Sequence, residues 1–135
     1  MKALFFPLAN GWADNTGCPY ITLSAQDLAN LASSFVDGVG AVTCTIDGVP
    51  VKHVANAATS PYRVGQQVFS YTLAHEDNIL ANYFGAACIA DGTAVAPAAE
   101  DGEYLLLSPL SAGHHTIHFT VPGYLDITYK LTVKR

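Results

Sequence analysis

The stretch Leu125-Asp-Ile-Thr-Tyr-Lys-Leu-Thr-Val133 alternates apolar and polar side chains more regularly than any other part of the chain. Ile127, Tyr129, Leu131 and Val133 fall on one side of this pattern, with polar residues between them. Successive side chains of a β-strand point to opposite faces of its sheet, so a period of two indicates a strand with one buried face. We therefore predict a strand over residues 125–133.

Similar short apolar runs recur upstream, and most are separated by Gly, Pro, Asn or Asp residues. The predicted strands cover Ala3–Ala9, Val42–Ile46, Val49–Val51, Val68–Leu73, Glu103–Leu107 and His114–Val121. Asp47-Gly48 is a dipeptide typical of a two-residue hairpin turn, and Pro50 places the returning strand at a sheet edge. The segment Asn78–Phe84 fits either a strand or a short helix, and Ala86–Glu100 reads as a long connection with one short strand.

Seven or eight short strands joined by Gly and Pro turns are the pattern of a sandwich or barrel. The sequence therefore predicts a mainly β fold, as a Greek-key β-sandwich or jelly roll. The 135 residues fit one domain, which we place over residues 1–135. A domain of about this length buries roughly two-thirds of its unfolded surface and needs no disulfide or metal merely to fold.

One short amphipathic helix is predicted near residues 24–37. Ser24 is a suitable N-cap, and Asp27 three residues later forms a near capping box. Gly38 supplies the C-terminal stop. The apolar residues between these signals follow helical spacing on one face, namely Leu28, Leu31, Ala32, Phe35 and Val36.

Composition and charge exclude several classes of protein. Half the residues are hydrophobic and 13% are charged, against about 25% in a typical domain, so the chain is not disordered. The net charge is −5 and the six basic residues are scattered. Nucleic-acid binding usually needs a basic patch, so we expect no nucleic-acid partner. No apolar run approaches the roughly 20 residues of a membrane helix, so no membrane insertion is predicted.

The N-terminal stretch reads as a first strand rather than as a signal peptide, because its apolar run is short and ends in a polar loop. The three cysteines, Cys18, Cys44 and Cys88, fit neither a paired framework nor a zinc ligand set. They are either three small buried residues or one disulfide with a thiol left over. Cys18–Cys44 is the preferred pairing for such a bridge.

The loop after the first strand mixes aromatic and polar side chains and is the best candidate for a binding site. Its candidate residues are Asn10, Trp12, Asp14, Asn15 and Tyr20. A tryptophan in a polar loop can stack on a sugar ring or anchor a protein partner. Loops on a rigid sandwich also carry many binding residues. The competing interpretation is that Trp12 caps the end of the core.

The histidines are weak candidates for a metal site. His114 and His118 share a face of one predicted strand but lie about 13 Å apart, so one ion cannot take both. A site would need one of them with His75 or a carboxylate from elsewhere. The chain has no phosphate-binding loop, no dinucleotide fingerprint and no nucleophile motif. We therefore predict no catalytic residues and no cofactor.

Several motifs appear in a fixed order along most of the chain. They are Phe5-Phe6-Pro7-Leu8, Cys44-Thr45-Ile46-Asp47-Gly48-Val49-Pro50-Val51, Tyr62-Arg63, Val68-Phe69-Ser70, Leu107-Ser108-Pro109-Leu110-Ser111, His115-Thr116-Ile117-His118-Phe119 and Asp126-Ile127-Thr128-Tyr129. Together they resemble a group of uncharacterised bacterial proteins that are usually exported and have no assigned activity. The resemblance implies a β-sandwich and an extracytoplasmic setting, and it implies no catalytic residues.

Three functions remain open from the sequence. The first is a non-enzymatic module that binds an unknown ligand or protein partner through the loops at one end of the sandwich. The second is a structural domain that forms an oligomer, for instance a homodimer, since the charge content is low. The third is a small metal-dependent enzyme in a jelly-roll frame, with His75, His114 or His118 as ligands and Glu76 or Glu103 as base.

Overall fold

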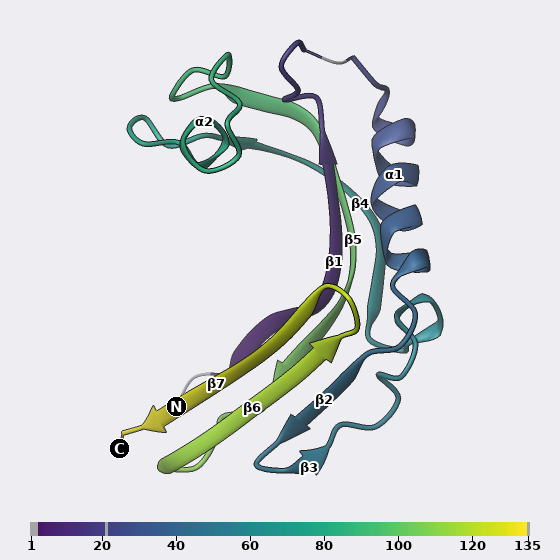
Figure 1. Ribbon diagram of the computed structural model, residues 1–135, viewed down its shortest axis with the longest axis vertical. Helices are drawn as coiled ribbons and strands as arrows, with labels where there is room; N and C mark the ends of the chain where they lie inside the picture. Colours follow the sequence, from purple (N-terminus) through teal and green to yellow (C-terminus); the bar gives the residue numbers. More distant parts are fainter. Residues whose placement is uncertain (1–2, 21, 135) are drawn as a thin grey trace.

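The computed structural model describes residues 3–20 and 22–134 and shows two antiparallel β-sheets (Figure 1). Sheet A has the order β1 (Leu4–Asp14), β5 (Ala94–Leu107) and β4 (Arg63–Thr72). Sheet B has the order β3 (Val49–Pro50), β2 (Thr43–Ile46), β6 (Gly113–Val121) and β7 (Leu125–Val133). The predicted mainly β fold is confirmed, and the two sheets are consistent with the predicted β-sandwich.

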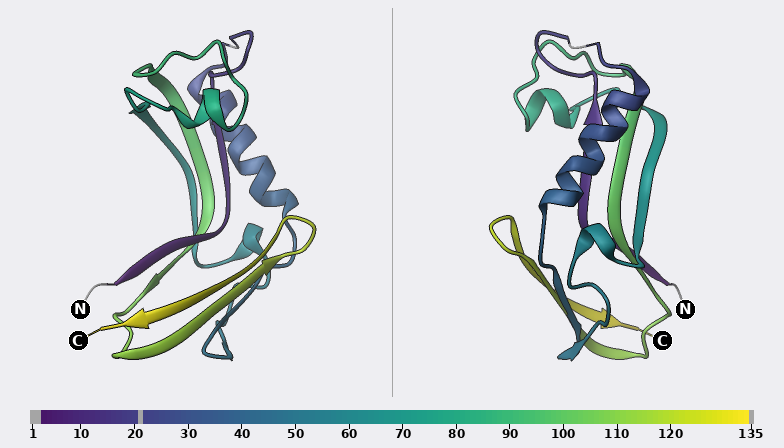
Figure 2. Two further views of the ribbon diagram at one scale, coloured as in Figure 1. Left: turned by 60° about the vertical axis from the view of Figure 1, so that its left-hand side comes forward. Right: turned by 90° about the vertical axis from the view of Figure 1, so that its right-hand side faces the viewer.

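Sheet A is long and curved, and helix α1 (Ala25–Gly38) lies lengthwise along its convex side (Figures 1 and 2). We call the side that faces α1 the outer face of sheet A, and the opposite, concave side its inner face. Ala99 packs against α1, and Asp101 bonds to it through Ser33. Because side chains alternate along a strand, Glu100 and Gly102 point to the inner face.

Helix α1 forms where the sequence predicts it. Ser24 and Asp27 make the full capping box, in which each side chain accepts from the other's backbone amide. The residues buried against sheet A are Leu28, Ala29, Ala32, Ser33 and Val36. Leu31 and Phe35 were predicted on the same face, but they lie at the border of the buried stripe and are 51% and 44% exposed.

Helix α1 lies unusually close to strand β1. A Cβ atom added at Gly11 would lie 2.3 Å from the carbonyl oxygen of Ala32. Real Cβ atoms do not approach that closely, so a side chain at position 11 would push the helix away. Gly11 therefore lets α1 and β1 pack backbone to backbone, which fixes the position of Trp12. The prediction of a loop from Asn10 onwards is wrong, because β1 continues to Asp14 with Asn10 and Trp12 in the strand.

The main core lies between sheet B, the C-terminal end of α1, and the part of sheet A that contains Leu8 and Leu105. It includes Leu8, Val36, Phe119 and Val121, each at most 3% exposed. The β1–β5 register shifts between Pro7 and Ala9, so β1 has a bulge there. The bulge explains why two consecutive β1 residues, Leu8 and Ala9, are both buried.

The C-terminal strand and the first hairpin match their sequence patterns. Ile127 and Leu131 of β7 pack against the main core, as the alternation predicts. Asp47 and Gly48 both have positive φ angles, 52° and 79°, which is the type I′ geometry expected for this dipeptide. Strand β3 has only two residues and lies at the edge of sheet B, in agreement with Pro50.

Two segments differ from the prediction or resolve its ambiguity. Strand β5 begins at Ala94, within the segment read as a connection, and it is the central strand of sheet A. Its alanines look unlike a strand in sequence, yet Ala98 and Ala99 are fully buried, and Ala99 faces α1, where a small side chain lets the helix approach. The ambiguous segment contains a short helix, α2 (Ile79–Asn82), whose N-cap is Asn78.

A buried ion pair between β4 and β5 is hydrogen-bonded to helix α1. The Arg63 guanidinium donates to both carboxylate oxygens of Asp101, through Nε at 2.7 Å and Nη2 at 2.9 Å. The Ser33 hydroxyl of α1 donates to the same carboxylate at 2.6 Å. Burial raises the Asp101 pKa, but the bonds from Arg63 and Ser33 outweigh burial and hold it below its usual value.

No helix in the described part of the chain is both long enough and apolar enough to cross a membrane.

Candidate functional site

Trp12 lies near the end of β1 and points to the inner face of sheet A. Gly11 before it contacts α1 and Ala13 after it packs against the α1 side, so alternation directs the indole the other way. The side chain is 45% exposed, as the binding hypothesis requires. The ring of Tyr71 from β4 meets the indole edge to face, with centroids 5.6 Å apart, and this contact holds it in place.

Asp14 braces the loop that follows Trp12. One carboxylate oxygen accepts from the Thr16 amide at 2.9 Å and from the Thr16 hydroxyl. The other accepts from the Tyr71 hydroxyl at 2.5 Å. Burial and the bond to Asp14 raise the pKa of Tyr71. Through these three bonds Asp14 connects the end of β1 to the loop that follows it and to β4.

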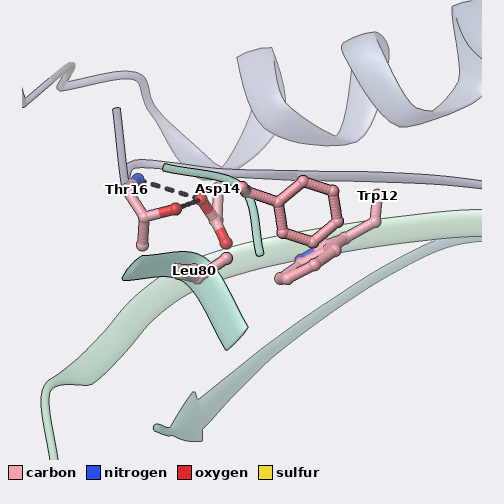
Figure 3. A pocket seen from close by; sticks show the side chains of 5 residues that line it. Trp12, Asp14, Thr16 and Leu80 are labelled. Carbon is pink, nitrogen blue, oxygen red and sulfur yellow. Dashed lines mark hydrogen bonds between the residues drawn. The ribbon is translucent and has the colours of Figure 1, made fainter. Parts of the chain in front are cut away.

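A small pocket opens beside these residues. Trp12, Asp14 and Thr16 line it from the β1 side, and Leu80 and Phe84 line it from the other side. These two belong to the stretch between β4 and β5, residues 73–93, which contains α2 and which we call the α2 segment. Figure 3 shows Trp12, Asp14, Thr16 and Leu80 around the pocket, with the bonds between Asp14 and Thr16 dashed. Its volume is about 210 Å³, below the roughly 300–1,000 Å³ of sites that enclose a whole small ligand. It therefore has room for one ring-sized group.

The α2 side of the pocket is held by Asn78, which is 1% exposed. Its side-chain oxygen accepts from the Ala81 amide at 2.9 Å and caps α2. Its side-chain nitrogen donates to the Ile89 carbonyl at 3.2 Å and to Asp91. Leu80 then packs with Leu73, Ile89 and Val95 in a small second core. The α2 wall of the pocket is thus a packed structure.

A disulfide joins the two walls, and its pairing corrects the sequence prediction. Cys18 is bonded to Cys88, with Cα atoms 5.9 Å apart, and not to Cys44. Cys44 lies on β2, where it faces the main core and is 3% exposed, so it cannot reach the loop that holds Cys18. Burial, with a smaller effect of nearby Glu103, raises the pKa of the Cys44 thiol to about 11.

The other predicted loop residues lie around the pocket but have different roles. Asn15 bonds to both the amide and the carbonyl of Leu23, at 2.8 and 3.0 Å, and so shapes the loop. Tyr20 is 61% exposed, and its hydroxyl donates to the Cys88 carbonyl at 3.4 Å. Both line a neighbouring hollow of about 380 Å³ that shares Thr16 with the Trp12 pocket.

A third hollow lies on the other side of Trp12. It has a volume of about 580 Å³ and is lined by Asn10, Trp12, Leu31, Ser34 and Phe35, among others. Trp12 thus lines both the Trp12 pocket and this third hollow, and Thr16 lines both the Trp12 pocket and the hollow beside Tyr20. The five predicted residues Asn10, Trp12, Asp14, Asn15 and Tyr20 are distributed over these three depressions, and none of the three contains them all.

Of the three histidines proposed as metal ligands, His114 and His118 lie on β6 with different partners, and His75 lies in the loop after β4. The His114 ring contacts the Thr132 hydroxyl at 3.1 Å, and the His118 ring contacts Asp126 at 2.9 Å. His75 lies beside Gly92. Among residues 3–20 and 22–134 no three His, Cys, Asp or Glu side chains form a group that could hold a metal ion. Glu103, proposed as a base, is fully buried in the core.

Charge is distributed unevenly over the fold. The described residues that line the Trp12 pocket and its two neighbouring hollows include no Lys or Arg. The α2 segment adds Glu76, Asp77 and Asp91 near the same end. The basic residues that the structure describes are Lys52, Arg63, Lys130 and Lys134. Lys130 lies in β7 and Lys134 directly after it, Lys52 follows β3, and Arg63 is held in the ion pair with Asp101.

Sequence reasoning missed the α2 wall of the pocket. Leu80 and Phe84 lie in the segment that fitted either a strand or a helix. Asn78 is a suitable helix N-cap, and the adjacent aromatic residues Tyr83 and Phe84, which are 79% and 62% exposed, come at the C-terminal end of the helix that it begins. That combination was the available signal, but nothing local placed it opposite Trp12.

No protein-family model, curated protein or solved structure matches this chain.

Proposed function

We propose that the protein is a non-enzymatic binding module that holds one ring-shaped group, without negative charge, in the Trp12 pocket. The observation that carries this proposal is the half-exposed indole at the mouth of a preformed pocket. Large exposed aromatic rings contribute much of the affinity at binding sites, and their flat faces suit a ring-shaped group.

The hydrogen bonds of Asp14 support binding rather than acid–base chemistry. Its carboxylate accepts from three donors, two of Thr16 and one of Tyr71. A general base must be free to take a proton from a substrate, whereas Asp14 is occupied in holding Thr16 and Tyr71. Such bracing keeps the pocket in one shape before the ligand arrives, which lowers the entropic cost of binding.

The charges at this end of the molecule support a ligand without negative charge. Asp14 lines the pocket itself. The described lining residues include no cation that could pair with a phosphate, sulfate or carboxylate group. An anion would therefore lose its hydration without gaining a partner.

The disulfide supports an extracytoplasmic setting for this module. Disulfides persist mainly in oxidising compartments, and Cys18–Cys88 joins the two sides of the site. The setting implied by the resemblance to exported bacterial proteins agrees with this.

The test uses the only tryptophan of the chain as a reporter. Its fluorescence is titrated with uncharged rings (glucose, N-acetylglucosamine), a cation (choline) and an anion (citrate). We expect a saturable change with an uncharged or cationic compound and none with citrate. Calorimetry should then show the same binding lost in Trp12→Ala and kept in Tyr129→Ala, whose side chain is equally exposed at 46% but lies on sheet B. Binding that survives in Trp12→Ala contradicts the proposal.

A further inference from the structure

The inner face of sheet A continues from the Trp12 pocket towards the opposite end of the sheet. The strand register identifies its members, because residues directly opposite one another in neighbouring strands share a face. Trp12 is opposite Glu100, Asn10 opposite Gly102, and Phe5 opposite Leu106. On β4, Gln67 is opposite Glu100, and Phe69 is opposite Ala98. Six positions of β5 separate Glu100 from Leu106, so the face runs for about 20 Å beyond Trp12.

A second aromatic surface occupies the far end of this face. A Cβ atom at Gly102 would lie 2.7 Å from the Tyr104 ring, so the ring occupies the space that a side chain at position 102 would fill. Phe5 stacks on Tyr104 with centroids 5.4 Å apart and ring planes 9° from parallel. Phe5 is 67% exposed and Leu106 is 70% exposed. We call Phe5 and Tyr104 the aromatic platform; it lines a hollow of about 470 Å³.

Polar groups connect the platform to Trp12. The Tyr104 hydroxyl donates to the Glu100 carboxylate at 3.0 Å, and Glu100 is the residue opposite Trp12. The exposed side chains of Asn10 and Gln67 flank Glu100 and Gly102 on the neighbouring strands. The face therefore alternates between aromatic rings and groups that accept or donate hydrogen bonds.

This order of groups fits one class of ligand. An acyl chain would leave Asn10, Gln67 and Glu100 without partners, and desolvating them costs free energy. An anionic polymer would meet the carboxylates of Asp14 and Glu100. Arg63 lines the platform hollow, but its guanidinium is already bonded to Asp101 and Asp37. Rings that carry hydroxyl groups satisfy both features, since their faces stack on aromatic side chains and their hydroxyls bond to amides and carboxylates.

We propose that the inner face binds an uncharged saccharide chain, which runs from the Trp12 pocket to the Phe5–Tyr104 platform. This inference rests on the proposed function, because it extends the same site from one ring to several. The Trp12 pocket holds one unit, the strip between Asn10 and Gln67 bonds the hydroxyls of the next units, and the platform stacks on a distal unit.

The test is calorimetric titration of the full chain with uncharged oligomers of glucose, mannose, galactose and N-acetylglucosamine, from one to six units long. We expect the affinity for at least one series to rise about 10-fold or more with length, since each aromatic stacking contact contributes about 3- to 10-fold. Because the ligand is uncharged, the affinity should not change between low and high salt.

Two variants locate the distal contact. Phe5→Ala should weaken the longest ligand of that series about 3- to 10-fold and leave the shortest one unchanged, and Phe5→Tyr should restore the loss. The matched control is Val68→Ala, because Val68 is 54% exposed in the same sheet and is opposite Ala99, on the outer face. It should not affect any length. Circular dichroism confirms that each variant folds.

The results separate the two proposals. Equal affinity at every length, no effect of Phe5→Ala on the longest ligand, or no binding by any oligomer overturns the saccharide-chain proposal. In the first two cases the Trp12 pocket still stands if Trp12→Ala abolishes binding of the short ligand. A Trp12→Ala variant that binds every length as well as wild type overturns both proposals.

Discussion

Replacing Arg63 by methionine should destabilise the protein by about 3–5 kcal/mol, because it leaves Asp101 as a buried charge without its cation. Asp101 is 1% exposed and has lost nearly all contact with water. Arg63 supplies two of its charge-assisted hydrogen bonds, at 2.7 and 2.9 Å. Methionine fills much of the same space, so the loss measures the missing charge rather than a cavity.

The dependence on pH gives the prediction a second measurable feature. In the wild-type protein the Asp101 pKa is lowered, so its stabilising contribution is present at neutral pH and is lost as the pH falls through that lowered pKa. Without Arg63, burial should raise the pKa instead. The difference in unfolding free energy between wild type and Arg63→Met should therefore be large at pH 7 and shrink towards pH 4.

Urea denaturation at pH 7 and pH 4, followed by far-UV circular dichroism, measures this difference. The control is Asp37→Asn, which removes the other carboxylate that contacts Arg63, at 2.5 Å. Asp37 is 56% exposed, so its loss should cost less than about 1 kcal/mol. If Arg63→Met costs no more than Asp37→Asn, the ion pair does not stabilise the contact between α1 and sheet A.

Further predictions concern the core, the packing of α1 and the disulfide. Burial raises the pKa of Glu103. The folded state therefore gains stability from this group below its unfolded pKa of about 4.3, and it loses that stability as the pH rises. The stability of Glu103→Gln relative to wild type, measured by urea denaturation, should therefore increase from pH 5 to pH 8. Gly11→Ala should cost about 1–3 kcal/mol or more in the same assay, because its Cβ would meet Ala32. Gly38→Ala, which meets no atom within 4 Å, should be neutral or stabilising. Replacing both disulfide cysteines by serine should cost up to about 4 kcal/mol, since the bridge spans 70 residues, and thermal unfolding with and without reductant checks it.

The fold was largely predictable because local patterns agree with it. The alternation in residues 125–133, the capping box at Ser24 and the turn at Asp47 each correspond to an observed feature. Strand β5 was mostly missed because its identity depends on long-range packing. Ala98 and Ala99 carry no strand signal, yet both are fully buried at the centre of sheet A, and Ala99 lies beneath α1, where a small side chain lets the helix approach.

Only the β1 side of the candidate site could be predicted, again because the opposite side depends on long-range packing. Trp12 and Asp14 were selected because a tryptophan in a polar loop is unusual, and both line the pocket. Leu80 and Phe84 are about 70 residues away in sequence, and only the tertiary fold brings them opposite Trp12. The disulfide pairing depended on the same information, because the partner of Cys18 lies in the α2 segment.

The most direct test of the proposed binding site is a pair of ¹H–¹⁵N correlation spectra, without and with a saturating uncharged ring compound chosen by the fluorescence titration. The single tryptophan gives one indole N–H signal, which can be assigned without ambiguity. We predict that this signal shifts together with the amides of Thr16 and Leu80, from the two walls of the pocket. Shifts confined to sheet B, with the indole signal unchanged, would contradict it.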